Sequence, residues 1–288
     1  MEKDMKIGIC LWEYRRRYPL KEAAKQLFAD GYEAIDFSEL HNVKGPFYTE
    51  DESKVKALLE EEAKILADAG IKISQIHGPW RYPPEDGTAQ ARAEWLSLME
   101  RAARMATYLG TPYMVVHPLM PFGADSPENP AEVLRINTEH YARLCDYAKE
   151  IGVTVCLENM PFPSLPLAHV SQILSFVDSL GKKNLKVCLD TGHANVCGMK
   201  IDEAIRMLGD RLAVFHIHDN NGKSDQHLMP GLGNIDFRGM GAALAEIGFD
   251  GVLSSEAHVG NDAPDEEFRK NAKAMADTLI KIKENHLI

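Results

Sequence analysis

The stretch Lys186-Val-Cys-Leu-Asp-Thr-Gly-His193 changes from an apolar run to an acid, a threonine, a glycine and a histidine. An apolar run of this length that ends in polar residues predicts a β-strand buried on both faces. Because side chains alternate along a strand, Cys188 and Asp190 should point to one side and Leu189 to the other. Asp190 is then the first ionisable group at the strand end, where a carboxylate needs a cation, hydrogen bonds or water. His193 follows in what we expect to be a loop.

The same alternation of an apolar run and a helical pattern occurs eight times along the chain. Strands are predicted at residues 6–12, 34–40, 72–77, 113–117, 154–159, 186–190, 212–219 and 251–258. Helices are predicted at residues 19–30, 49–69, 88–109, 130–151, 167–180, 202–208, 237–247 and 265–285. A glycine follows every predicted helix except the last, as is typical of a helix C-terminus.

Strands that alternate with helices predict right-handed crossovers and a parallel sheet. Eight such units are the number that closes a (β/α)₈ barrel, and we find no low-complexity linker, so a single domain over 1–288 is expected. The alternative fold is a doubly wound open sheet. It is less favoured because no G-x-G-x-x-G motif follows the first strand.

Composition excludes several classes of protein. The chain has 288 residues, 45% hydrophobic and 26% charged, and a net charge of −11. No apolar run approaches the ~18 residues needed to cross a bilayer, so no membrane association is expected. The basic residues form no cluster beyond Arg15-Arg-Arg17, which argues against nucleic acid as a partner. The first residues contain no apolar signal region, so we expect a cytoplasmic protein whose five cysteines are reduced.

Polar residues stand at the carboxyl ends of six consecutive predicted strands. In a barrel these ends converge on one mouth, where enzymes of this fold place their chemistry. The residues are His77, His117, Glu158, Asp190, the group of His216, His218 and Asp219, and finally Glu256 with His258. Apolar neighbours such as Leu157 and Phe215 should face the helices, which leaves the polar side chains on the inner face of the barrel.

Four of these residues form a set suited to a divalent metal. Glu158, Asp190, His216 and Glu256 supply carboxylate oxygens and one imidazole nitrogen, as Zn²⁺, Mn²⁺, Co²⁺ or Mg²⁺ require. Without a cation, mutual repulsion of three carboxylates would raise their pKa values and destabilise the fold. We therefore predict one bound divalent cation.

Several ordered motifs resemble those of the xylose-isomerase-like TIM barrels, over nearly the whole chain from Ile7 to Glu256. They are Leu157-Glu-Asn159, Leu189-Asp-Thr-Gly-His193, Phe215-His-Ile-His-Asp-Asn220 and the run from Asp225 through His227 to Gly233. This superfamily contains sugar (phosphate) isomerases and epimerases, the ketose 3-epimerases among them, inositol-pathway dehydratases and isomerases, and endonuclease IV.

The resemblance implies roles for individual residues. Glu158, Asp190, His216 and Glu256 match the four ligands of the single metal of the ketose 3-epimerases. In that branch the two glutamates also exchange the substrate proton on opposite faces. Chelation of a carbonyl and its adjacent hydroxyl acidifies the C–H and stabilises an enediolate, which is chemically consistent with these roles. His193 matches a residue that contacts a substrate oxygen.

Other residues at the mouth are predicted to bind the sugar. We expect His77 and His117 to assist His193 with hydroxyl groups. Trp12, at the end of the first predicted strand, is a candidate to stack on a sugar ring. The expected partner is a small carbohydrate, phosphorylated or not, and the resemblance implies a homo-oligomer.

The same superfamily supports a competing function. Endonuclease IV binds three zinc ions through nine ligands, and residues of the required type occur here at all nine positions. They are His77, His117, Glu158, Asp190, His193, His216, Asp225, His227 and Glu256. Asp225 and His227 are therefore candidate ligands of an additional metal. However, Ile217-His-Asp-Asn-Asn-Gly222 departs from the nuclease pattern after the metal-binding histidine, and the acidic chain disfavours DNA.

Two further functions remain open at the level of sequence. A metal-dependent dehydratase of keto-polyols needs the same acidified C–H, followed by loss of hydroxide. A sugar-sensing barrel would bind its ligand without catalysis. A barrel fold cannot choose among these chemistries, because it is compatible with all of them.

Overall fold

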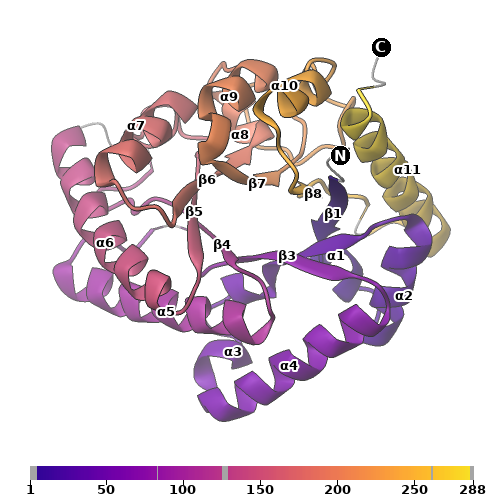
Figure 1. Cartoon of the computed structure of the whole chain (residues 1–288), viewed down its shortest axis with the longest axis horizontal. Helices are drawn as coiled ribbons and strands as arrows, with labels where there is room; N and C mark the ends of the chain where they lie inside the picture. The colour runs from indigo at the N-terminus through magenta and orange to yellow at the C-terminus, as the bar shows by residue number, and fades with distance from the viewer. Residues whose placement is uncertain (1–4, 83, 125–128, 261, 286–288) are drawn as a thin grey trace.

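The computed structural model describes residues 5–82, 84–124, 129–260 and 262–285. Eight parallel strands form a ring that the helices surround (Figure 1). The strands are β1 (Lys6–Cys10), β2 (Ala34–Phe37), β3 (Lys72–His77), β4 (Tyr113–Val116), β5 (Thr154–Glu158), β6 (Leu185–Asp190), β7 (Leu212–His216) and β8 (Val252–Ser255). The predicted (β/α)₈ barrel is confirmed.

The strands follow one another around the ring in chain order. The sheet runs β7-β6-β5-β4-β3-β2-β1-β8, and every strand pair within it is parallel. The barrel closes just beyond the end of β7, where the amide of Ile217 donates to the carbonyl of Ser254 at 2.8 Å. The carbonyl of Ile217 in turn accepts from the amide of Glu256 at 3.0 Å.

Helices cover the outside of the ring, and short helices occupy several loops. The main helices are α2 (Leu20–Asp30), α4 (Glu52–Asp68), α5 (Ala89–Tyr108), α6 (Pro130–Glu150), α7 (Val170–Leu180), α9 (Ile201–Leu208), α10 (Met240–Ile247) and α11 (Asp265–Lys283). The short ones are α1 (Trp12–Arg15), α3 (Pro46–Thr49), α8 (Thr191–Val196) and the 3₁₀ turns η1 (Ser38–His41) and η2 (Gly209–Arg211). None of the helices in the described ranges has both the length and the apolar character needed to span a membrane.

Local sequence explains where the helices begin and end. The side chains of Asp51, Thr88 and Asn129 accept a hydrogen bond from the first turn of α4, α5 and α6, respectively. Gly181 ends α7 with a φ of 61°, a left-handed conformation that glycine adopts without a steric penalty. These signals are local, which explains why sequence alone predicts them well.

The alternation predicted for the central strands is also confirmed. Leu157, Leu189 and Phe215 lie in the main core between the sheet and the helices. Cys156 and Cys188 instead form a small cluster with Val115 and Val214 in the barrel interior. Residues of the same parity as these cysteines, including Glu158 and Asp190, therefore point inward, where they reach the mouth.

Several predicted strands are shorter than expected. Strand β1 stops at Cys10, and Trp12 is the first residue of the short helix α1. Strand β2 stops at Phe37 and gives way to η1. Strand β7 stops at His216 and β8 at Ser255, so His218 and His258 lie in loops. In each case the chain leaves the barrel at its rim although the apolar or aromatic pattern continues.

Candidate active site and metal centre

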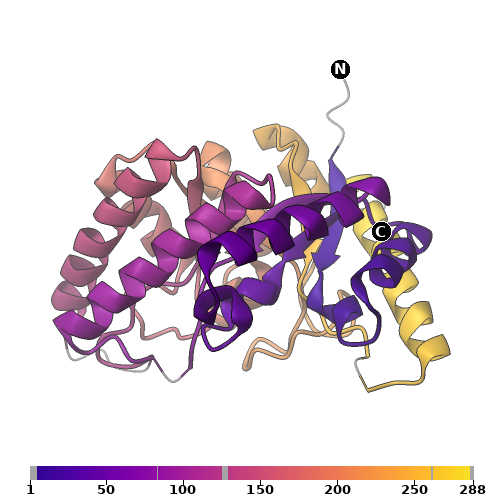
Figure 2. The same cartoon turned by 90° about the horizontal axis from the view of Figure 1, so that it is seen from below.

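The carboxyl ends of the strands surround a cavity of about 280 Å³. The long loops that follow the strands gather on the same side of the barrel, the lower side in Figure 2. The described residues that line the cavity are Trp12, Ser38, His41, His77, Trp80, His117, Glu158, Met160, Pro161, Phe162, His193, Asp225, His227 and Glu256. All predicted substrate-contacting residues are therefore at this mouth.

The four predicted metal ligands come together at the bottom of this mouth. Glu158, Asp190, His216 and Glu256 each present a ligand atom, and these atoms all lie within 4.8 Å of one another. Nδ1 of His216 is 3.0 Å from Oε1 of Glu158 and 3.4 Å from Oε2 of Glu256. The first three side chains are buried, whereas the Glu256 side chain is 18% exposed. A ligand in the cavity can therefore reach the cluster on the side of Glu256.

Strand register and hydrogen bonds from neighbouring groups hold Asp190 in this cluster. In the sheet Asp190 pairs with His216, so the ends of β6 and β7 lie level with each other. The Asn159 amide group donates to the Asp190 carbonyl at 3.0 Å, and its oxygen accepts from the Asp190 amide at 2.9 Å. One carboxylate oxygen of Asp190 also accepts from the amide of His193 at 2.7 Å and caps α8. The predicted loop after β6 is thus the short helix α8, and His193 lies on it.

His216 is fixed by a residue that sequence analysis missed. Oδ2 of Asp36, on β2, lies 2.9 Å from Nε2 of His216. Since a carboxylate accepts, Nε2 carries a proton toward Asp36, while Nδ1 faces the carboxylates of Glu158 and Glu256, where a cation would take the place of an Nδ1 proton. The only sequence signal for Asp36 is an acid within the apolar run Ala34–Phe37.

Electrostatics at this cluster favour additional positive charge. Burial alone would lower the pKa of His216, but Cys188 and the nearby carboxylates raise it well above its ordinary value. Burial alone would raise the pKa of Glu158, but His216 and His117 hold it well below its usual range. The cluster concentrates the negative charge of three carboxylates beside one imidazole in a buried site. This set of donor atoms is suited to binding a divalent cation.

A second group adjoins Glu158 on the side of β3 and β4. Nε2 of His77 is 3.2 Å from Nε2 of His117, which is itself 3.1 Å from Oε2 of Glu158. The carbonyl of Gly78 accepts from Nδ1 of His77 at 2.8 Å, so the His77 lone pair is on Nε2 and faces the group. Burial and the neighbouring His117 lower the pKa of His77 to about 4. A neutral His77 imidazole in this arrangement can bind a metal or accept from a hydroxyl.

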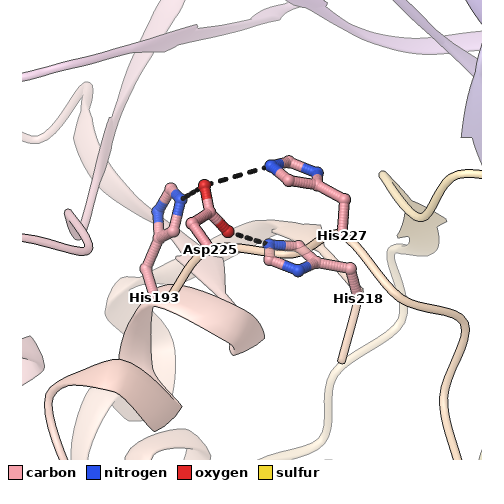
Figure 3. Close-up of side chains that lie close together, drawn as sticks. All are labelled: His193, His218, Asp225 and His227. Atoms are coloured by element: carbon pink, nitrogen blue, oxygen red, sulfur yellow. Dashed lines mark hydrogen bonds and ion pairs between the residues drawn. The ribbon is translucent and has the colours of Figure 1, made fainter. Parts of the chain in front are cut away.

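A third group adjoins Asp190 and Glu256 of the central cluster. In this group Asp225 lies between imidazoles (Figure 3). Oδ2 of Asp225 is 3.2 Å from Nε2 of His193 and 3.1 Å from Nε2 of His227. Nδ1 of His193 donates to the carbonyl of Asn159 at 2.8 Å, and Nδ1 of His227 donates to that of Glu256 at 3.0 Å. Both Nε2 atoms can therefore offer lone pairs to one cation.

In this third group the carboxylate and the imidazoles shift one another's pKa values. Burial would lower the pKa of both histidines, yet nearby carboxylates raise the pKa of His193 and of His227 to about 10. Burial would raise the pKa of Asp225, but hydrogen bonds from the same two histidines hold it well below its usual range. Protonated imidazoles thus supply the positive charge that a cation would otherwise bring.

His218 also joins this third group, but in a different way. Its Nε2 is 2.9 Å from Oδ2 of Asp190 and 3.6 Å from Oδ1 of Asp225. Its Nδ1 has no hydrogen-bond partner in the described part of the chain, unlike Nδ1 of His193 and His227. Without an acceptor for an Nδ1 proton, His218 is better placed to donate from Nε2 to Asp190 than to bind a metal through Nε2.

A single buried carboxylate holds the loop that carries Asp225 and His227. Oδ2 of Asp219 accepts from the amides of Gly231 and Gly233, at 2.9 and 3.0 Å. Its Oδ1 accepts from the amides of Asn220 and Ile235, at 2.8 and 3.0 Å. These bonds connect the beginning and the end of the loop to Asp219, just after β7. They thereby position the third group over the barrel.

Aromatic side chains form much of the cavity wall. Trp12 meets His258 edge to face at 5.4 Å, and Trp80 meets His117 in the same manner at 5.7 Å. None of the described residues that line the cavity is a lysine or an arginine. Arg81, in the loop after β3, is instead engaged by Asp86 at 3.2 Å. This lining suits the faces and hydroxyl groups of an uncharged carbohydrate.

Comparison with known proteins identifies relatives over most of the chain. Residues 22–278 match a protein family described as xylose isomerase-like TIM barrel. A D-psicose 3-epimerase of Agrobacterium fabrum is 29% identical over 68% of each chain, and an inosose isomerase of Bacillus velezensis is 28% identical over 82% of each. The uncharacterized protein MJ1311 of Methanocaldococcus jannaschii is 36% identical, but the alignment spans 44% of either chain.

Solved structures share the architecture. A D-tagatose 3-epimerase-like protein superposes with a TM-score of 0.75 at 25% identity, over 97% of this chain and 99% of the other. The IolI protein, whose crystal structure contains a bound zinc atom, superposes with a TM-score of 0.74 at 22% identity, over 97% and 98%. Relatives with named activities include sugar epimerases and isomerases.

Proposed function

Because the chain belongs to the family of xylose isomerase-like TIM barrels, we propose that it is a divalent-metal-dependent sugar isomerase or epimerase. The observation that carries the proposal is the convergence of Glu158, Asp190, His216 and Glu256 on one point beneath a carbohydrate-sized cavity. The named activities of the relatives support the same class of reaction. We propose that residues 1–288 form one barrel domain.

We assign the cation to the four converging residues. Their oxygens and the Nδ1 atom of His216 are donors that Mn²⁺, Zn²⁺, Co²⁺ or Mg²⁺ accept. The zinc atom in the IolI structure shows that a protein of this architecture can bind a divalent cation. A cation held there would polarise a substrate carbonyl and acidify the neighbouring C–H bond. Every remaining step falls to side chains of the protein.

Glu158 and Glu256 are the proposed acid and base. Both carboxylates lie next to Nδ1 of His216, at 3.0 and 3.4 Å, and they come from strands β5 and β8, which are not neighbours in the sheet. The lowered pKa of Glu158 keeps this carboxylate ionised at neutral pH and able to accept a proton. One glutamate, as a carboxylate, removes the proton from carbon, and the other, as a carboxylic acid, donates a different proton to the opposite face; exchange with solvent restores both groups.

The substrate proposed for this site is an uncharged ketose or related polyol. The cavity has aromatic walls, and its described lining offers no lysine or arginine to a phosphate group. His77, His117 and His193 present ring nitrogens that can hydrogen-bond sugar hydroxyls, while Trp12 can stack on a sugar face. We place the enzyme in the cytoplasm as a homo-oligomer, in line with its five free cysteines and its resemblance to the epimerases.

The test combines metal analysis with isotope exchange. Protein purified without added metal should contain about one Mn, Zn, Co or Mg per chain, measured by elemental mass spectrometry. Incubation with D-fructose or D-tagatose in D₂O should then introduce deuterium at the carbon that exchanges its proton. Deuterium at C3 indicates an epimerase, deuterium at C1 or C2 an aldose–ketose isomerase, and loss of water a dehydratase. Tight sugar binding without any deuterium uptake would contradict catalysis and favour a sensing role.

A second candidate function is a three-metal phosphodiesterase like endonuclease IV. The observation that favours it is that the groups of His77 with His117 and of Asp225 with His227 flank the central cluster. We propose these two groups as additional metal sites, and His193 as a further ligand beside Asp225. The acidic chain, and a described lining without lysine or arginine, count against DNA as substrate. About three zinc ions per chain, together with cleavage of abasic DNA, would establish this function in place of the first.

A further inference from the structure

Asp36 is a buried carboxylate that contacts the proposed metal centre from the far side of the barrel. It is fully buried on β2, and its Oδ2 lies 2.9 Å from Nε2 of His216 on β7. The residues are 180 positions apart in sequence, and β2 and β7 are not neighbours in the sheet. The contact therefore crosses the interior of the barrel.

Local structure holds this carboxylate in place. The register between β2 and β3 shifts at Ile35 and Asp36, and such an irregularity re-aims a side chain. The amide nitrogen of Gln75 donates to the same Oδ2 at 3.0 Å and also reaches the carbonyl of Phe215 at 3.3 Å. Gln75 thus ties Asp36 to the strand that carries His216.

We propose that Asp36 is a positioning residue that holds His216 as a metal ligand through Nδ1. By accepting the Nε2 proton, Asp36 leaves Nδ1, which faces Glu158 and Glu256, as the ring nitrogen that would bind a cation in place of a proton. Its charge makes the imidazole a stronger donor toward a cation, and its position fixes the ring plane. This inference rests on the proposed function, because it assumes that the central cluster binds a cation.

A purely structural role explains Asp36 less well. Its Oδ1 is buried and has no hydrogen-bond partner in the described part of the chain. A buried carboxylate with an unpaired oxygen costs stability, and an apolar side chain would fill the barrel interior without that cost. The contact with His216 gives a reason for a charge at this position.

The experiment measures cation affinity directly, by calorimetric titration of the metal-free protein with Mn²⁺ or Co²⁺. Asp36→Asn removes the charge at nearly constant shape and should raise the Kd about 10- to 100-fold. The visible absorption of bound Co²⁺ should change as well, because the ligand field at His216 changes. Asp30→Asn is the matched control, since Asp30 is also buried but bonds the hydroxyl of Tyr14, and it should leave the Kd unchanged.

The outcomes separate this inference from the proposed function. If the wild type binds no cation, the proposed metal-dependent function fails. If the wild type binds a cation and Asp36→Asn binds it equally well, the positioning role is wrong and the metal centre stands. Should Asp36→Asn not fold, Gln75→Leu provides the test, because it releases Asp36 without removing its charge. Its Kd should rise several-fold, and an unchanged Kd would overturn the inference.

Discussion

The backbone of Gly192 lies directly against the imidazole ring of His218. A β-carbon at Gly192 would stand 2.0 Å from Cε1 of that ring, well inside any permitted contact. The hydroxyl of Thr191 accepts from the amide of His218 at 3.0 Å and donates to its carbonyl at 2.7 Å. The motif Asp190-Thr-Gly-His193 therefore contributes to packing. Its threonine and glycine hold His218 in place, and Nε2 of His218 contacts the Asp190 carboxylate.

Gly192→Ala should destabilise the protein by about 1–3 kcal/mol, because the new methyl group overpacks the site against His218. In a His218→Ala background the same substitution should cost less, since the ring that it strikes is gone. Urea unfolding of the four proteins in this cycle measures the coupling. Gly87→Ala, whose β-carbon would meet its nearest atom at 3.4 Å, is the control. Equal costs of Gly192→Ala in both backgrounds would contradict the packing role.

Glu158→Gln and Glu256→Gln should each lower turnover about 10²- to 10⁴-fold, because each removes one of the two groups that exchange the substrate proton. Both variants should keep the wild-type far-UV circular dichroism spectrum. The rate of deuterium uptake from D₂O into the substrate is the measurement. Glu52→Gln, which alters an ion pair with Arg104 on the outer helices, should leave that rate unchanged. A Glu158→Gln variant with the wild-type rate would rule out its catalytic role.

Under the three-metal alternative, His227→Ala should remove a cation from the group around Asp225 and leave the central cluster loaded. The reason is that His227 supplies one of the nitrogens that face Asp225, whereas it supplies none of the four central ligands. Metal content at saturating Zn²⁺ should therefore fall by about one ion per chain relative to the wild type. His169→Ala, which changes a half-buried histidine at the start of α7, should bind as much zinc as the wild type. If His227→Ala and the wild type bind equal amounts, the additional site at Asp225 does not exist.

The buried carboxyl group of Glu62 should make the free energy of unfolding depend on pH, independently of the metal centre. Burial raises the pKa of this carboxyl from 4.5 to about 7, and Arg15 at 3.4 Å only partly offsets that shift. A raised pKa in the folded state gives stability that is complete below pH 4.5 and is lost as the pH rises through 7. Glu62→Gln, which stays neutral, should therefore add on the order of 1–2 kcal/mol at pH 8 after allowance for solvent screening, and little at pH 5.

Urea unfolding at the two pH values measures this difference. Glu60→Gln changes an exposed neighbour on the same helix that pairs with Lys56, and should alter stability by less than about 0.5 kcal/mol at either pH. An equal effect of Glu62→Gln at pH 5 and pH 8 would show that its charge does not destabilise the folded protein.

Most of the barrel and the central donor set could be predicted from sequence. Eight apolar runs, each followed by a helical pattern, specify the parallel barrel because strand and helix periods are local properties of the chain. Alternation within the strands ending at Glu158, Asp190 and His216 then predicts which side chains face inward. The arrangement of these three side chains with Glu256 follows from strand order alone.

The ends of the strands were less predictable. Trp12 and His193 lie on short helices rather than in a strand and a loop, because the rim of the barrel sets where the chain must turn. An apolar or aromatic pattern that continues past that rim carries no signal of the turn. Both residues nevertheless line the cavity, since their positions along the chain bring them to the mouth in either conformation.

The contacts that orient the site were decided only by the tertiary structure. A single acid in the run Ala34–Phe37 has no periodicity that points to a histidine 180 residues away, so Asp36 could not be paired with His216 in advance. The fit of His218 against Gly192 depends equally on closure of the barrel. Sequence determined which side chains face the interior, because that choice follows from the local backbone period. Which of them meet, and through which ring nitrogen, depends on distances across the barrel that exist only once its strands have closed.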